Sequence, residues 1–220
     1  MTWVSKYGSV TFNQAGREFP YGGMNEAGLV IEQMWLQEAK YPAADDRYGM
    51  NELQWMQYQL DNSASVQDVI DSDTLVRITY MPTSYLHFLV SDASGDVATI
   101  EYLEGKMVVH RGKQLPYTVL ANCIYENSLE YKTSMDLGSE KEYADWTVNS
   151  SGRFVKAASL IRDYNSTEDR IDYSFSILDS VAQGPHTQWS IVYDISDMVI
   201  HYRSQINPVR QTIDLKNIDF

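Results

Sequence analysis

The first part of the chain alternates between apolar and polar residues in a pattern that is typical of β-strands. Residues 2–12 include Trp, Val, Tyr, Thr and Phe, the aromatic and β-branched types that favour strands. The glycines of 22–28 predict a turn, and residues 29–36 then form a mostly apolar run. A run of this length after a turn indicates a buried strand. We therefore expect the chain to begin with part of a sheet.

Two helices are expected next, and each begins after a residue that can cap it. Asn51 precedes a segment in which apolar residues recur at helical spacing as far as residue 60. Ser65 and Asp68 have the spacing of a capping box, with Asp in the place of Glu. This box opens a second, shorter helix. Helices therefore follow the first strands directly, after a polar loop at 42–48.

A second block of strands is separated by turn-forming residues. Residues 86–91 and 97–103 are predicted strands on either side of Asp-Ala-Ser-Gly-Asp, whose residue types tolerate a left-handed backbone. The next turn leads to a strand at 107–110. Residues 118–121 are expected to form a short strand that ends at Asn122.

The last third of the chain is predicted to return to helices and then to strands. The polar stretch 126–146 is typical of a loop or a short helix. We expect helices at 154–161 and from a Ser166 cap to 181, strands at 189–194 and 198–203 in a hairpin, and a last strand from 213. This order predicts an α+β fold with mostly antiparallel sheets, and two sheets with helices outside both would fit it.

The composition narrows the class of protein. The 220 residues, 44% of them apolar and 21% charged, fit one large globular domain or at most two small ones. No stretch approaches the about 18 consecutive apolar residues of a membrane helix. The net charge of −13 repels phosphate backbones, so no nucleic-acid partner is expected. A single cysteine excludes an internal disulfide and a multi-cysteine zinc site.

The sequence contains no GxGxxG, Walker, HExxH or GxSxG motif. The four histidines lie far apart in the sequence, and the apolar surroundings of His87 favour a hydrogen-bonded strand histidine over a metal ligand. Cys123 has no activating neighbour in the sequence, so we interpret it as a small buried hydrophobic residue. We therefore expect neither a metal nor a cofactor.

Three segments combine glycine turns with polar residues in a distinctive order. They are residues 22–29 (GGMNEAGL), residues 91–122, which run from SDASGDVATIEY to VLAN, and residues 150–154 (SSGRF). Taken singly, each has an ordinary explanation as a turn, a hairpin or a helix start. In this order they resemble the linear amide C–N hydrolases of the choloylglycine hydrolase family, which includes bile-salt hydrolases and penicillin V acylases. The resemblance covers residues 3–203.

The resemblance implies a four-layer αββα sandwich of the N-terminal-nucleophile hydrolases, in agreement with the α+β order above. The family nucleophile is a cysteine that begins the mature chain and whose free α-amine accepts the thiol proton. The present sequence opens at a position that resembles one after the nucleophile hairpin. We therefore expect residues 1–220 to be a single, N-terminally incomplete domain without its nucleophile. Cys123 cannot replace it, because a cysteine inside the chain has no free α-amine.

The resemblance also implies roles for three residues of this chain. Asn122 matches the family asparagine whose side-chain amide donates to the oxyanion. Trp35 falls where the family supplies a second oxyanion donor from its backbone N–H. Arg153 matches an arginine near the nucleophile, where a cation favours the thiolate. An ordinary role stays open for each residue. Asn122 would be a turn residue at a strand end, Trp35 a core aromatic, and Arg153 a surface arginine at a helix start.

The family lines its acyl pocket with the loop that here holds Tyr80, Met81 and Tyr85. Aromatic and thioether groups suit an apolar acyl chain or ring, although core packing explains them equally well. The family has asparagine at the position of Trp35 in many bile-salt hydrolases and tyrosine in penicillin acylases. The resemblance therefore implies that an indole here favours an acylase-like small-molecule N-acyl amide over a bile salt. Bile-salt hydrolases carry an assembly loop in the stretch that corresponds to 122–153, and this stretch is shorter here. We therefore do not carry over their tetramer, and whether this protein forms a homo-oligomer stays open.

Two functions are compatible with these observations. The first is hydrolysis of non-peptide linear amides through a cysteine that this chain lacks. The second is a truncated, inactive homologue that at most binds ligands. A third hypothesis makes Thr2 the nucleophile after removal of Met1, but the resemblance places Thr2 at the start of a later strand. No signal peptide is visible, and the compartment, whether cytoplasmic, periplasmic or secreted, stays open.

Overall fold

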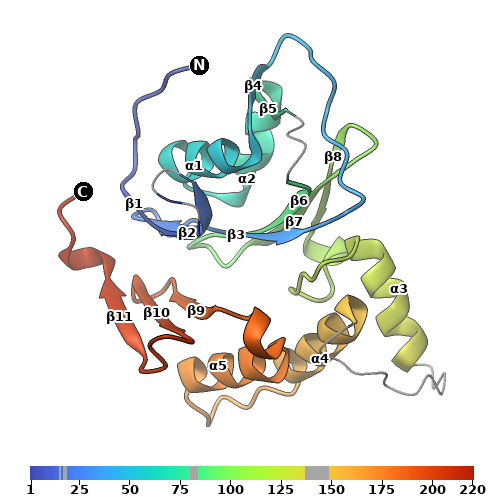
Figure 1. Ribbon diagram of the computed structural model, residues 1–220, viewed down its shortest axis with the longest axis vertical. Helices are drawn as coiled ribbons and strands as arrows, with labels where there is room; N and C mark the ends of the chain where they lie inside the picture. Colours follow the sequence, from blue (N-terminus) through green and yellow to red (C-terminus); the bar gives the residue numbers. More distant parts are fainter. Residues whose placement is uncertain (15, 17–18, 80–83, 137–148) are drawn as a thin grey trace. The chain divides into compact units, whose positions relative to one another are not determined.

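A computed structural model describes residues 1–14, 16, 19–79, 84–136 and 149–220 (Figure 1). The chain divides into two compact units, which are described separately below. The first contains Met1–Pro116 and Lys216–Phe220, and the second contains Tyr117–Leu215. The expectation that both belong to one domain stays a prediction.

The first unit contains a six-stranded sheet in the order β1-β2-β3-β6-β7-β8, in which every neighbouring pair is antiparallel. A small parallel pair, β4 with β5, lies outside this sheet. The predicted strands at 86–91 and 97–103 are confirmed at both ends. The strand bounds are Ser9–Asn13 (β1), Pro20–Asn25 (β2), Val30–Trp35 (β3), Tyr48–Met50 (β4), Val76–Ile78 (β5), Leu86–Ser91 (β6), Val97–Leu103 (β7) and Lys106–Arg111 (β8).

Both predicted helices of this unit are present, and both are capped as expected. Asn51 caps α1 (Glu52–Asn62), and its side chain accepts the backbone N–H of Gln54 at 2.7 Å. Ser65 and Asp68 form a reciprocal capping box at the start of α2 (Val66–Asp71). Short 3-10 helices follow at Ser72–Thr74 and Gly112–Gln114.

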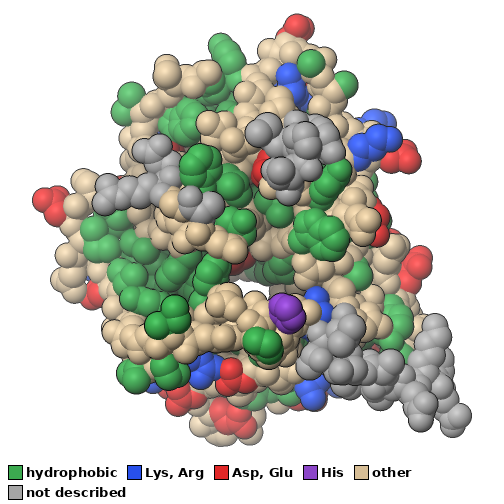
Figure 2. Space-filling view, in the orientation of Figure 1, with side chains coloured by type: hydrophobic (Ala, Val, Ile, Leu, Met, Phe, Trp, Pro, Cys, Tyr) green, Lys and Arg blue, Asp and Glu red, His purple; other side chains and the backbone are tan. Residues whose placement is uncertain are grey.

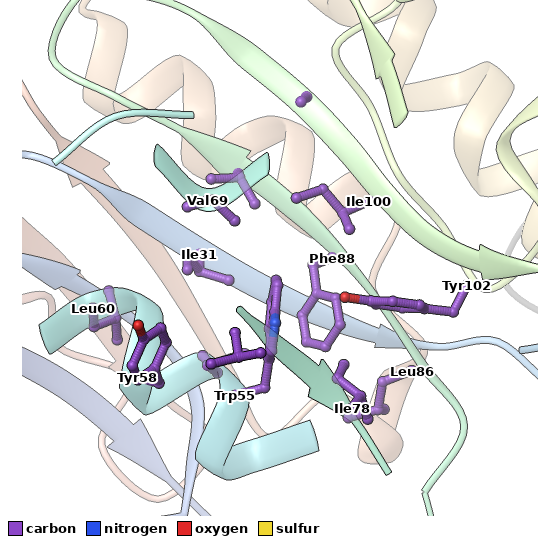
Figure 3. Close-up of a cluster of buried hydrophobic side chains, with 14 of the residues drawn as sticks. Ile31, Trp55, Tyr58, Leu60, Val69, Ile78, Leu86, Phe88, Ile100 and Tyr102 are labelled. Carbon is purple, nitrogen blue, oxygen red and sulfur yellow. The ribbon is translucent and has the colours of Figure 1, made fainter. Parts of the chain in front are cut away.

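Aromatic packing forms the core of the first unit between α1 and one face of the sheet (Figure 3). The ring of Trp55, on α1, lies 4.6 Å from that of Phe88 and 6.4 Å from that of Tyr102, measured between centroids. All three side chains have no exposed surface. The alternating apolar residues of β6 and β7 therefore contact the apolar side of α1, as the period of two along each strand requires.

The glycines of 22–28 are placed differently from the sequence prediction. Gly22 and Gly23 lie inside β2, and the turn is confined to Asn25–Gly28, where Gly28 has φ +83°. The reason is close packing, because a Cβ added to Gly23 would lie 2.7 Å from the backbone oxygen of Val10 on β1. Glycine thus lets two strand backbones approach, rather than turning the chain.

We predict that Gly23→Ala destabilises the protein by about 1–3 kcal/mol, since the new methyl group must displace the backbone of β1. Urea denaturation followed by circular dichroism measures the loss. Gln67→Ala, at an exposed position of α2, is the control and should change stability by less than about 0.5 kcal/mol. An unchanged midpoint for Gly23→Ala would show that β1 can move without cost.

Asn25 connects the turn to the helix that packs beside it. Its Nδ2 donates to the backbone oxygens of Leu60 and Ser63, each at 2.8 Å, and its Oδ1 accepts the N–H groups of Ala27 and Leu29. The side chain is fully buried. One amide group therefore satisfies four backbone groups, which are costly to bury without partners.

The second unit contains a three-stranded antiparallel sheet in the order β11-β10-β9 and helices that include α5, which packs against β9. The predicted hairpin is confirmed as β9 with β10, and the predicted last strand is present as β11, which begins two residues before the expected 213. The bounds are Tyr125–Asp136 (α3), Ser150–Arg162 (α4), Arg170–Ser180 (α5), Trp189–Asp194 (β9), Val199–Ser204 (β10) and Gln211–Asp214 (β11), with 3-10 turns at Gly184–His186 and Leu215–Asn217.

One predicted strand and two predicted helix starts in this unit are wrong. Residues 118–121 form an irregular segment instead of a strand. The helix expected from residue 154 begins earlier, because Asn149 caps it by accepting the N–H of Ser151. The last helix is capped by Asp169 and not by Ser166, since the Asp169 carboxylate accepts two N–H groups of the first turn.

The predicted α+β class is confirmed, because helices accompany an antiparallel sheet in both units. Within the described residues, no helix has the length and apolar character that crossing a membrane would require. On the face drawn in Figure 2, Lys and Arg side chains are scattered among Asp and Glu and do not gather into a basic surface.

Candidate functional site

The second unit brings Asn122 and Arg153 together, although they are 31 residues apart in the sequence. Nη2 of Arg153 donates to Oδ1 of Asn122 at 3.1 Å. This bond fixes the orientation of the amide, because the side-chain oxygen faces the guanidinium and the NH₂ group points away from it. An amide held in this way presents its N–H hydrogens in a defined direction, as an oxyanion donor must.

Local structure explains why these two side chains meet. Asn122 follows three buried apolar residues, Val119–Ala121, that anchor the irregular segment. Arg153 lies in the first turn of α4 between Gly152 and Phe154, which are both buried. The helix start directs the half-buried arginine toward Asn122.

Cys123 is a third member of this cluster, and sequence reasoning missed its position. It is half-buried, so the expectation of a small buried hydrophobic residue is wrong. Its Sγ lies 3.6 Å from the Oγ of Ser151. Burial lowers the pKa of Arg153 below its usual value, and the Coulombic interaction with Cys123 opposes this shift. The available signal was proximity in the sequence, because Cys123 follows Asn122 and Ser151 lies two positions before Arg153.

Trp35 lies in the first unit, at the end of β3, and its side chain is 51% exposed, which excludes the role of a core aromatic. Trp35 is paired with Leu86 of β6, whereas Leu36 donates its N–H to the oxygen of Tyr85 at 2.8 Å. Hydrogen-bonded and non-hydrogen-bonded pairs alternate along antiparallel strands. The backbone N–H of Trp35 therefore points away from β6.

The hydroxyl of Tyr41, on the other side of β6, supports the conclusion that Trp35 and Leu86 share no backbone hydrogen bond. It accepts the N–H of Leu86 at 2.8 Å and donates to the oxygen of the same residue at 3.3 Å. Both backbone groups of Leu86 thus face Tyr41 and not Trp35. The buried hydroxyl has its pKa raised well above the usual value by burial, so it stays protonated and can donate.

The expected acyl-pocket residues are only partly described. Tyr85 is half-buried and directly precedes β6, so it lies beside Trp35 at one end of the sheet. Tyr80 and Met81 lie outside the described residues. Trp35 and Tyr85 belong to the first unit, and Asn122 and Arg153 belong to the second.

The expected role of His87 is confirmed. Its Nδ1 lies 3.0 Å from an oxygen of Glu101, and both side chains are fully buried. Among the residues that the structure describes, no three His, Cys, Asp or Glu side chains are grouped so that they could hold a metal ion.

Comparisons with known proteins identify the family. Residues 5–141 match the linear amide C-N hydrolases, choloylglycine hydrolase family. The chain is 29% identical to a penicillin V acylase of Pectobacterium atrosepticum over 262 aligned residues, which cover 100% of this chain and 69% of that protein. The structure of penicillin V acylase from Agrobacterium tumefaciens is similar at 31% identity and a TM-score of 0.83, covering 99% of this chain and 72% of that one.

A bile acid hydrolase shares the fold at lower identity. A variant of the conjugated bile acid hydrolase from Clostridium perfringens matches with a TM-score of 0.80 and 17% identity, over 98% of this chain and 79% of that one. The family match extends over more than half of the chain. The chain therefore belongs to the choloylglycine hydrolase family of linear amide C–N hydrolases.

Proposed function

We propose that this chain is the larger part of an acylase-like hydrolase, which cleaves the amide bond of small N-acyl substrates through an acyl thioester. The observation that carries the proposal is the contact between Arg153 and Asn122. It places a cation and an oriented amide group together, and both are useful where a thiolate attacks a carbonyl. The two similar penicillin V acylases support an amide as the substrate.

The proposed nucleophile is a cysteine at the head of the mature protein, in a segment that precedes the 220 residues of this sequence. Its thiol proton passes to its own α-amine as sulfur attacks the carbonyl carbon. The amide of Asn122 and the backbone N–H of Trp35 stabilise the oxyanion. The C–N bond then breaks, and the α-ammonium returns the proton to the leaving amine.

Hydrolysis of the thioester completes the reaction. Water attacks the acyl carbon while the α-amine accepts a proton from it. The C–S bond breaks, the acid leaves, and the thiol is restored with that proton. Arg153 favours the thiolate, which is the attacking form in the first step and the leaving group in the second.

The substrate in this proposal carries an apolar acyl group. The exposed indole of Trp35 would contact that group, and the family resemblance assigns Tyr80, Met81 and Tyr85 to the same acyl pocket. A small-molecule N-acyl amide such as penicillin V fits an apolar wall of this kind.

A non-catalytic homologue that at most binds such ligands is the second candidate. The observation that favours it is the position of the only cysteine in the sequence, Cys123, whose nitrogen is part of a peptide bond and cannot act as the base. The hydrolase predicts that adding a segment that begins with cysteine restores turnover, and the non-catalytic homologue predicts that it does not.

The experiment joins a hairpin that begins with cysteine ahead of residue 1, taken from the coding sequence upstream. We call this protein the nucleophile-bearing chain. We expect it to release phenoxyacetate from penicillin V, while replacement of the added cysteine by alanine abolishes turnover. N-acyl homoserine lactones and conjugated bile salts are assayed in parallel. No turnover of any of the three substrates would reject the hydrolase and leave the binding homologue.

A further inference from the structure

The segment that carries Asn122 is held at its start by a tyrosine hydroxyl. The Oη of Tyr125 accepts the backbone N–H of Tyr117 at 3.3 Å and donates to the backbone oxygen of Tyr117 at 2.9 Å. Tyr117 and Asn122 both lie in the irregular stretch that precedes α3, five residues apart. Because this segment lies outside any strand, a side chain supplies the pairing that a sheet neighbour would otherwise give.

The same tyrosine joins this segment to the helix that carries Arg153. Tyr125 is the first residue of α3 and is fully buried. Its ring packs edge-on against Phe154 with centroids 5.8 Å apart, and the ring of Tyr117 meets Phe154 at 6.3 Å. Phe154 directly follows Arg153 in α4. One aromatic cluster therefore fixes both partners of the bond between Arg153 and Asn122.

A buried lysine further along α3 strengthens the contact between this helix and Tyr117. Nζ of Lys132 lies 5.3 Å from the centroid of the Tyr117 ring and pairs with Asp136 at 2.6 Å. Only 1% of Lys132 is exposed, so its charge acts on the ring with little competition from water. The ring of Tyr117 is thus held by α3 while its backbone is held by Tyr125.

We propose that Tyr125 is a positioning residue for the Asn122 amide, acting through its two hydrogen bonds to the Tyr117 backbone. This inference rests on the proposed function in that it takes the Asn122 amide as the oxyanion donor. A donor stabilises the oxyanion only when it is held in place before the reaction, and displacements of about 1 Å are costly. Tyr125 itself does not touch the reacting atoms.

Tyr125→Phe tests the proposal, because it keeps the ring and removes only the hydroxyl. The matched control is Tyr173→Phe in the same unit, whose hydroxyl also donates to a backbone oxygen, that of Leu160, at 2.6 Å. Leu160 lies seven positions after Arg153 in α4, which is about 10 Å along the helix. Both variants are made in the 220-residue chain, so no catalysis is needed.

Two measurements report on the site. The first is the side-chain amide signal of Asn122 in a spectrum of protein labelled with ¹⁵N only at asparagine, assigned by its loss in Asn122→Ala. The second is the rate at which iodoacetamide alkylates Cys123, the only thiol in the chain. We expect Tyr125→Phe to shift the amide signal and to accelerate alkylation about tenfold, since two hydrogen bonds are lost. Tyr173→Phe should leave the amide signal in place and change the rate by less than about twofold.

Lys132→Met is a second variant that leaves the Tyr125 hydroxyl intact. It should accelerate alkylation about threefold, because only the cation above the Tyr117 ring is lost. The proposal is overturned if Tyr125→Phe leaves both the amide signal and the alkylation rate unchanged. It is equally overturned if Tyr173→Phe changes them as much.

Activity separates this inference from the proposed function. In the nucleophile-bearing chain, Tyr125→Phe should lower kcat about tenfold while KM changes less than about twofold, since the donor acts in the transition state. If the nucleophile-bearing chain is itself inactive, the proposed function fails. The amide signal and the alkylation rate still decide whether Tyr125 positions Asn122.

Discussion

Asn122→Ala is expected to lower kcat of the nucleophile-bearing chain by about 10²–10³-fold, the usual cost of removing one oxyanion donor. KM should change little, because the oxyanion exists only after the nucleophile has attacked. The bond from Arg153 orients the amide that is lost. Steady-state hydrolysis of penicillin V over a range of concentrations measures both constants.

The matched control is Asn165→Ala in the same unit. Asn165 is exposed, and its side chain accepts the nearby N–H of Thr167 at 3.2 Å. Its kcat should stay within about twofold of the parent value. A folded Asn122→Ala protein with unchanged kcat would remove Asn122 from the mechanism and leave it the role of a turn residue.

Trp55→Ala is expected to destabilise the protein by about 3–5 kcal/mol, because it empties the centre of the core in the first unit. The ring is fully buried and contacts both Phe88 and Tyr102 (Figure 3). Such a loss is a large part of the about 5–15 kcal/mol that stabilises a typical domain. Guanidinium denaturation followed by near-ultraviolet circular dichroism measures it.

Trp55→Phe separates the loss of volume from the loss of the indole N–H. Among the described residues, Nε1 of Trp55 is buried and has no hydrogen-bond partner. Phenylalanine keeps most of the ring and removes this donor, so its cost should be below about 1.5 kcal/mol. A cost for Trp55→Phe equal to that of Trp55→Ala would mean that the packing of the pyrrole part of the indole, which both variants lack, carries the whole effect.

Sequence patterns predicted those helices and strands whose boundaries are set by residues a few positions away in the sequence. The caps at Asn51 and Ser65 were predictable because a cap bonds to backbone three positions away. The strands on either side of residues 92–96 were predictable for the same reason, since their turn contains its own glycine. In contrast, Gly23 was misplaced because its role depends on Val10 of another strand.

The candidate site was predictable only by resemblance. Asn122 and Arg153 were singled out by their motifs, and no spacing rule indicates that residues 31 apart form a hydrogen bond. Cys123 was misjudged because its surroundings come from Ser151 on a separate helix. Tyr125 was not singled out at all, since a tyrosine that bonds to backbone eight residues earlier has no sequence signature.

The buried amide of Asn25 has a consequence for how relatives of this protein can diverge. Aspartate at this position would turn an oxygen toward the carbonyls of Leu60 and Ser63, and alanine would leave them without a donor. We therefore expect substitutions of Asn25 to destabilise the fold whether or not the protein keeps its chemistry. The GMNEAGL string is thus explained by architecture, because its asparagine ties the turn after β2 to the end of α1.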